Sequence, residues 1–122
     1  MTAKHVAIVT GANHGIGAAT ARALSRRGDA VLCTYLRVED PYDPGTPQTY
    51  RDNRAQDAAT VVAAITEAGG TAAAVEADLS DPAAPAMLFD TAEERLGPVD
   101  ILVNNATASV KDTFTANVIT LR

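Results

Sequence analysis

Three glycines near the N-terminus have the spacing of a phosphate-binding turn. Gly11, Gly15 and Gly17 lie in the run TGANHGIG, which begins at Thr10. Because glycine has no Cβ, the backbone can come close to an anionic ligand at these positions. A helix that starts at such a turn presents free N–H groups and the positive end of its dipole to the anion. The pattern therefore predicts that the chain binds a nucleotide phosphate.

A second segment whose residues could contribute to a binding site is the run DILVNNA, from Asp100 to Ala106. Paired asparagines after an apolar run can bond neighbouring backbone and hold a loop in place. No cysteine and histidine cluster has metal-ligand spacing, so no metal site is predicted. Ser109, Lys111 and Asp112 have residue types found in nucleophilic sites, but the sequence places no histidine beside them. We therefore predict no catalytic residue within this chain.

Alternating strands and helices are predicted to position these motifs. The apolar run before the glycine turn predicts a strand over 5–10, and a helix follows over 15–27. Further strands are expected over 30–35, 71–76 and 99–103, and helices over 53–68 and from about 82 to 96. Three prolines in the polar stretch 38–52 predict a long loop there. In the helix over 53–68, the spacing of Ala58, Val61, Val62 and Ile65 predicts a buried face.

The predicted fold class is α/β, a Rossmann-type doubly wound parallel sheet. Strands separated by helices form right-handed βαβ units, which gives the strand order 3-2-1-4 with an incomplete second half. We expect residues 1–122 to form one nucleotide-binding domain, with the ligand at the carboxyl ends of the strands.

The composition excludes some classes of binding partner and indicates the cellular compartment. The net charge of −5 and the lack of a basic stripe argue against nucleic acid and anionic membranes as partners. The single cysteine, Cys33, excludes an internal disulfide and is expected to be a buried structural thiol. The N-terminus leads directly into a strand, and no apolar run approaches the length of a membrane span. These features predict a cytoplasmic protein.

The motifs together resemble the short-chain dehydrogenase/reductase family. The family's glycine motif T-G-x-x-x-G-I-G is matched in full, Asp78-Leu79 is similar to its acidic-apolar pair, and DILVNNA matches its strand-4 motif, with Thr107 where glycine is usual. The resemblance implies NAD(P) binding. The pyrophosphate would be lined by Gly11, Gly15 and Gly17, with further contacts from Asn13, His14 and Ile16. Asp78 with Leu79 would meet the adenine, and Asn104 and Ala106 would lie beside the nicotinamide-side ribose.

The residues near the end of the second predicted strand favour NADP over NAD. An acidic residue there would bond the ribose 2′-hydroxyl and repel a 2′-phosphate, but Tyr35 occupies the position. Arg37 could pair with a phosphate, and His14 stands where NADP-dependent relatives often carry a basic residue. Glu39 and Asp40 work against phosphate binding. The loop 38–52 is expected near the adenosine ribose, either as a flap with contacts from Tyr42, Tyr50, Arg51 or Arg54, or as a mobile surface loop.

The resemblance implies an oxidoreductase that transfers hydride between nicotinamide and a small carbonyl or alcohol substrate. The family's catalytic Y-x-x-x-K does not occur here, because the residues four after Tyr35, Tyr42 and Tyr50 are not lysines. We therefore expect the chain to carry only the cofactor-binding part of the enzyme. The alternatives are a non-catalytic nucleotide-binding module and an interaction subunit completed by another chain. By analogy with the family, a homo-oligomer is expected.

Overall fold

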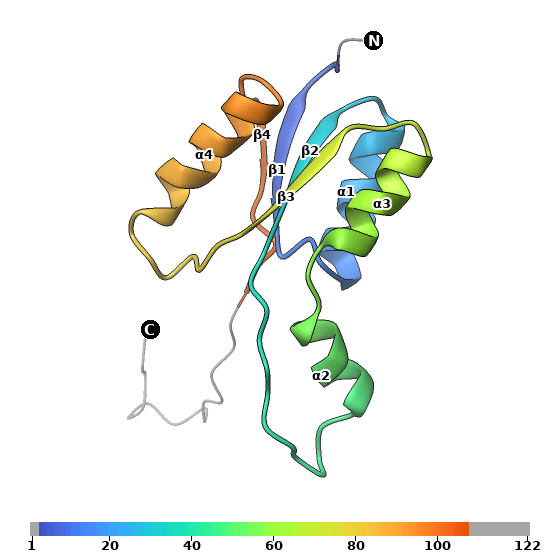
Figure 1. The fold of residues 1–122 in the computed structure, drawn as a ribbon, viewed down its shortest axis with the longest axis vertical. Helices are drawn as coiled ribbons and strands as arrows, with labels where there is room; N and C mark the ends of the chain where they lie inside the picture. Colours follow the sequence, from blue (N-terminus) through green and yellow to red (C-terminus); the bar gives the residue numbers. More distant parts are fainter. Residues whose placement is uncertain (1–2, 108–122) are drawn as a thin grey trace, which may run out of the picture.

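A parallel four-stranded sheet with helices on both faces forms the body of the protein (Figure 1). The structure is a computed structural model that describes residues 3–107. The strands are β1 (Val6–Thr10), β2 (Ala30–Tyr35), β3 (Ala72–Glu76) and β4 (Ile101–Val103). The helices are α1 (Gly15–Arg26), α2 (Gln48–Ala55), α3 (Ala59–Glu67) and α4 (Ala84–Arg95). The strand order is β3-β2-β1-β4, which confirms the predicted Rossmann-type topology.

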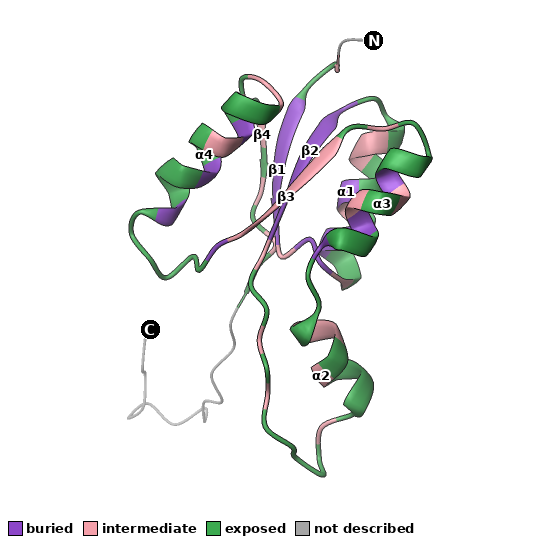
Figure 2. Ribbon diagram, in the orientation of Figure 1, coloured by how far each residue is buried: buried purple, intermediate pink, exposed green. Residues whose placement is uncertain are grey.

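The two central strands alternate their side chains between two cores. Val9, Val31 and Cys33 pack with residues of α1 and α3, whereas Ile8 and Leu32 pack with residues of α4. This alternation follows from the two-residue period of a strand, and burial on both faces explains the continuous apolar runs in the sequence. Figure 2 shows the buried residues along β1 and β2 and on the helix faces that meet the sheet.

The predicted loop and helix between β2 and β3 need correction. The loop prediction for 38–52 is wrong after Pro47, because α2 begins at Gln48. The predicted helix over 53–68 is wrong at its start, because the chain becomes extended at Gln56 and a new helix, α3, begins at Ala59. Asp57 explains the restart, since its carboxylate accepts a hydrogen bond from the Ala59 N–H at 2.9 Å.

The buried face expected for the second helix is confirmed. Ala58, Val61 and Ile65 are buried, and Val62 packs against the same core while partly exposed. By contrast, α2 has no buried residue and extends beyond the carboxyl ends of the strands (Figure 1). We call residues 38–55 the flap. Among the described helices, none has the length and apolar character needed to cross a membrane.

Candidate functional site

The glycine turn lies at the carboxyl end of β1, where two of its glycines adopt conformations that other residues rarely take. Gly11 has φ +66° and Gly15 has φ +58°. Gly17 is required for a different reason: a Cβ there would overlap the Gly11 carbonyl oxygen and lie 2.6 Å from Asn105 Nδ2. The start of α1 is therefore packed directly against the turn that precedes it, which only glycine allows.

The exit of β4 braces this turn through the Thr10 hydroxyl and the Asn105 side chain. Thr10 Oγ1 accepts hydrogen bonds from the N–H groups of Asn105 and Ala106, both at 3.0 Å, and donates one to the Val103 carbonyl at 3.3 Å. The Asn105 side-chain amide donates to the carbonyls of Thr10 and Gly11 at 3.1 and 3.2 Å. The prediction that the paired asparagines hold a loop is confirmed for Asn105. Asn104 is exposed beside it.

The N-terminus of α1 opens onto free space. A Cβ added at Gly15 would meet nothing within 4 Å, and Ile16 is 78% exposed. His14 is the N-cap residue but makes no side-chain capping bond, and the first turn contains no acidic residue. The first N–H groups of a helix have no partner within the helix. The turn thus offers backbone donors and a positive helix end to a ligand, with room for it above Gly15.

Asn13 connects the glycine turn to the end of the flap. It is 6% exposed, and its side-chain amide donates to the Gln56 carbonyl at 2.9 Å. The flap itself is held by the Val38 N–H, which donates to the Arg54 carbonyl at 2.7 Å, and by the ion pair between Arg54 and Asp40 at 2.6 Å. The Asn13 side chain is therefore used within the protein, which leaves the Asn13 backbone for the contact expected with the cofactor.

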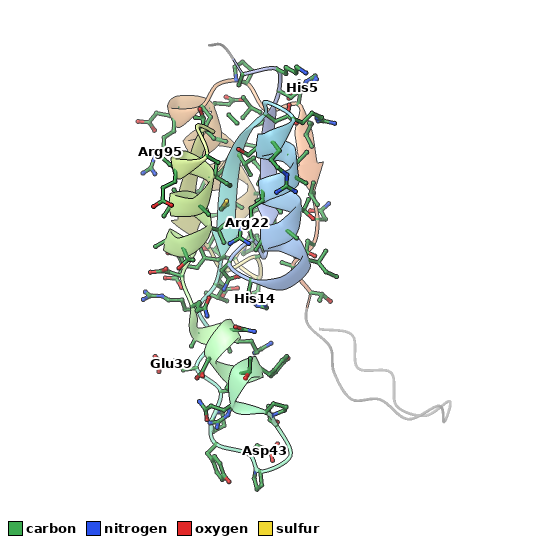
Figure 3. All side chains as sticks on the ribbon, turned by 90° about the vertical axis from the view of Figure 1, so that its right-hand side faces the viewer. His5, His14, Arg22, Glu39, Asp43 and Arg95 are labelled. Carbon is green, nitrogen blue, oxygen red and sulfur yellow. The ribbon has the colours of Figure 1, made fainter. Side chains whose placement is uncertain are left out.

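Two arginine-tyrosine contacts stabilise the flap further. The Arg51 guanidinium lies 5.2 Å from the centre of the Tyr42 ring, and the Arg54 guanidinium lies 5.5 Å from that of Tyr50. These distances are within the range of cation–π attraction. Figure 3 shows His14 at the end of the sheet from which the flap extends, whereas His5 lies at the opposite end.

Arg37 is paired with a carboxylate that the sequence did not single out. Its N–H donates to Glu76 Oε2 at 2.8 Å, and its guanidinium reaches both Glu76 oxygens, with Nη2 3.2 Å from Oε1. These hydrogen bonds lower the pKa of Glu76 and raise that of Arg37, so both groups are charged at neutral pH. The pair sits beside Tyr35, because Tyr35 and Glu76 are partners in the β2–β3 register.

Asp78 lies just beyond β3 as an ionised hydrogen-bond acceptor. Its Oδ1 accepts bonds from the Ser80 hydroxyl at 2.7 Å and the Ser80 N–H at 2.9 Å, and these lower its pKa. Asp78 and the neighbouring Leu79 are exposed. A hollow at this edge of the sheet is lined by residues from the end of β3 to the start of α4, namely Glu76, Ala77, Asp78, Asp81, Ala83, Ala84 and Met87.

Asp100 belongs to the opposite end of the sheet. Its carboxylate accepts a hydrogen bond from the Val6 N–H at 2.8 Å and pairs with the His5 ring, which lowers the pKa of Asp100. This residue of the DILVNNA run thus anchors β4 to β1 rather than lining the glycine turn.

One residue that matters to the site was not predicted from the sequence. The loop-holding role predicted for the two asparagines falls to Asn105. Glu76 gave no signal, since its role depends on a contact with Arg37 across two strands. Within residues 3–107, no three histidine, cysteine or acidic side chains come together as metal ligands. Ser109, Lys111 and Asp112 lie outside the described residues.

Comparison with known families decides the relationship. The family model of the short chain dehydrogenases matches residues 44–119 of this chain. The chain belongs to the short-chain dehydrogenase family. The family predicted from the sequence motifs is confirmed, and so is the fold that the resemblance implied.

Individual relatives agree with this assignment. An uncharacterized oxidoreductase from Methylorubrum extorquens is 41% identical over 101 residues, covering 83% of this chain and 34% of the relative. A 3beta-hydroxysteroid dehydrogenase from Eggerthella lenta is 41% identical over 99 residues, covering 81% of this chain and 32% of the relative. A blue fluorescent protein from a metagenomic library, in complex with NADPH, is similar in structure with a TM-score of 0.72 and 32% identity. That match covers 96% of this chain and 41% of the other. This short-chain dehydrogenase chain spans about a third of the length of the curated relatives it matches.

Proposed function

We propose that this chain forms the cofactor-binding part of an NAD(P)-dependent oxidoreductase, with NADP as the preferred cofactor. The observation that carries the proposal is the open cradle at the start of α1, where a ligand can approach Gly15 closely and meet unpaired helix N–H groups. The NADPH complex of the similar fluorescent protein supports the same ligand class. When bound, the nicotinamide cofactor supplies the hydride chemistry.

In this proposal the chain's own residues bind and orient the cofactor. The turn from Gly11 to Gly17 holds the pyrophosphate, and the ionised Asp78 accepts a hydrogen bond from the adenine amino group. Asn104 and Ala106 stand beside the nicotinamide-side ribose, because the brace through Thr10 fixes the β4 exit next to the turn.

The proposed preference for NADP rests on the residues at the carboxyl end of β2. Tyr35 ends β2 without a negative charge, and Arg37 follows with a guanidinium that can bind a phosphate. The substrate is proposed to be a small carbonyl or alcohol, and the protein a cytoplasmic homo-oligomer. If cofactor binds but no carbonyl substrate oxidises NADPH, the alternative of a non-catalytic nucleotide-binding module is favoured.

A glycine substitution tests the cradle directly. Gly15→Ala should weaken NADPH binding at least about tenfold, because it strains a positive-φ position and places a methyl group in the ligand space. Gly69→Ala is the matched control, since Gly69 has φ +88°, an equally open surrounding and a position after α3, away from the cradle. Each substitution should cost roughly 1–2 kcal/mol of unfolding free energy.

Fluorescence titration of the full chain with NADPH and NADH separates these effects. Selective loss of binding in Gly15→Ala supports the proposal. Equal affinities in the two variants, or no binding of either cofactor to the unmodified chain, would contradict it.

A further inference from the structure

The Arg37–Glu76 pair places a negative charge at the spot where the cofactor's 2′ substituent would be recognised. Glu76 is the last residue of β3 and the register partner of Tyr35, the last residue of β2. The last residue of β2 is therefore not acidic, but the carboxylate of Glu76 on the neighbouring strand β3 lies beside it. The Glu76 carboxylate binds both the backbone N–H and the guanidinium of Arg37.

The geometry of the pair limits what Arg37 can offer a phosphate. Arginine has five N–H donors, and here Nε and Nη2 both point to the Glu76 oxygens, at 3.4 and 3.2 Å. A phosphate that approached Arg37 would have to use the remaining donors. It would also lie close to a carboxylate of the same sign, which opposes its binding.

The same carboxylate is compatible with an unphosphorylated ribose. A carboxylate is an acceptor for hydroxyl donors, so a 2′-hydroxyl can approach Glu76 without charge repulsion. Arg37 is 56% exposed at its side chain and Glu76 33%, so solvent reaches both partners and a ligand can as well.

We propose that Glu76 determines cofactor specificity by partly neutralising Arg37, so that the site accepts NADH as well as NADPH and prefers the latter only weakly. This inference rests on the proposed function, because it requires that the chain bind a nicotinamide dinucleotide. It assigns the weakness of the preference for NADPH to one carboxylate on β3, which acts on Arg37 after β2.

The test is a double-mutant cycle read out by calorimetric binding of NADPH, NADH, 2′,5′-ADP and 5′-AMP to the full chain. Glu76→Gln keeps an acceptor for the Arg37 N–H and removes the charge. It should tighten NADPH and 2′,5′-ADP about three- to fivefold, as expected for one partly exposed charge interaction, and change NADH and 5′-AMP less than about twofold. Arg37→Gln should weaken the phosphorylated ligands more strongly in the Glu76→Gln background than in the unmodified chain, because the free guanidinium binds phosphate better.

Two controls make the outcome specific. Glu67→Gln changes the net charge equally at the exposed C-terminal end of α3 and should leave the NADPH-to-NADH affinity ratio unchanged. Raising the salt concentration should reduce the effect of Glu76→Gln, because exposed charges are screened. Thermal unfolding of each variant checks that the chain remains folded.

The results separate this inference from the proposed function. If both cofactors bind but Glu76→Gln leaves their affinity ratio unchanged, or lowers the affinity for NADPH, the specificity role of Glu76 is refuted and the cofactor site stands. If neither dinucleotide binds the unmodified chain, both the proposed function and this inference are refuted.

Discussion

Replacement of Thr10 by valine should weaken the connection between the glycine turn and the exit of β4, while the Asn105 side-chain bonds remain. The substitution keeps the shape of the side chain and removes the hydroxyl that joins Val103, Asn105 and Ala106. Three hydrogen bonds at a net value of about 1 kcal/mol each give an upper figure of about 3 kcal/mol. Because Ala106 is exposed and its N–H can bind water instead, we expect a loss of about 2 kcal/mol of unfolding free energy.

Urea unfolding of the full chain measures this loss, and cofactor titration measures its effect on the cradle. For a domain of this size, the melting temperature should fall by roughly 8 °C. The matched control is Thr34→Val, the same substitution at the register partner of Thr10 on β2, where the side chain is also buried. The reasoning fails if the two valine variants lose the same stability, or if Thr10→Val binds NADPH as tightly as the unmodified chain.

Further predictions concern groups away from the brace. Burial raises the pKa of Cys33 to about 11, so iodoacetamide at neutral pH should label this thiol only after unfolding; labelling of the folded chain would contradict its buried position. The lowered pKa of Asp100 means that its pairing with His5 stabilises the fold above the carboxylate's ordinary pKa of 3.8 and is lost as pH falls through the folded value. The unfolding free energy of His5→Gln, measured as a function of pH, should therefore be lower than that of the unmodified chain near neutral pH and should become equal to it in acid. A difference that does not change with pH would contradict the stabilising role of the His5–Asp100 pair. Asn13→Ala should speed trypsin cleavage in the flap. Asn53→Ala should not, because the Asn53 side chain bonds to the nearby Gln56 side chain and does not reach the glycine turn; equal cleavage rates in the two variants would refute the proposed role of Asn13.

The sheet topology could be predicted because it follows from patterns local to each segment. Apolar runs such as that ending at Val9 mark buried strands, and the alternation with helices leaves few topologies. The flap could not be predicted in the same way. Its helix α2 buries no residue and is held by charged and aromatic side chains such as Arg54 and Tyr50, so it lacks the apolar periodicity on which a helix prediction depends.

The candidate site was predictable to the extent that its parts are contiguous. Glycine was expected in this turn so that the backbone could approach a ligand, and the positive φ values at Gly11 and Gly15 add a second reason for glycine that the sequence argument did not use. The pairing of Arg37 with Glu76 was not predictable, because it depends on the β2–β3 register and joins residues 39 positions apart. For the same reason, the glycine motif alone could not predict that the Asn13 side chain bonds to the Gln56 carbonyl, 43 positions away.

The brace on the glycine turn has a consequence for the order of folding. Thr10 and Asn105 are 95 positions apart, so their contact closes nearly the whole described chain into one loop. Such closure is entropically costly and tends to form late. During synthesis, a chain that has released β1 and α1 carries every glycine of the motif and still lacks the contacts that fix their arrangement. A ligand that requires the braced turn would therefore bind only after β4 has docked, and its binding would stabilise that last step.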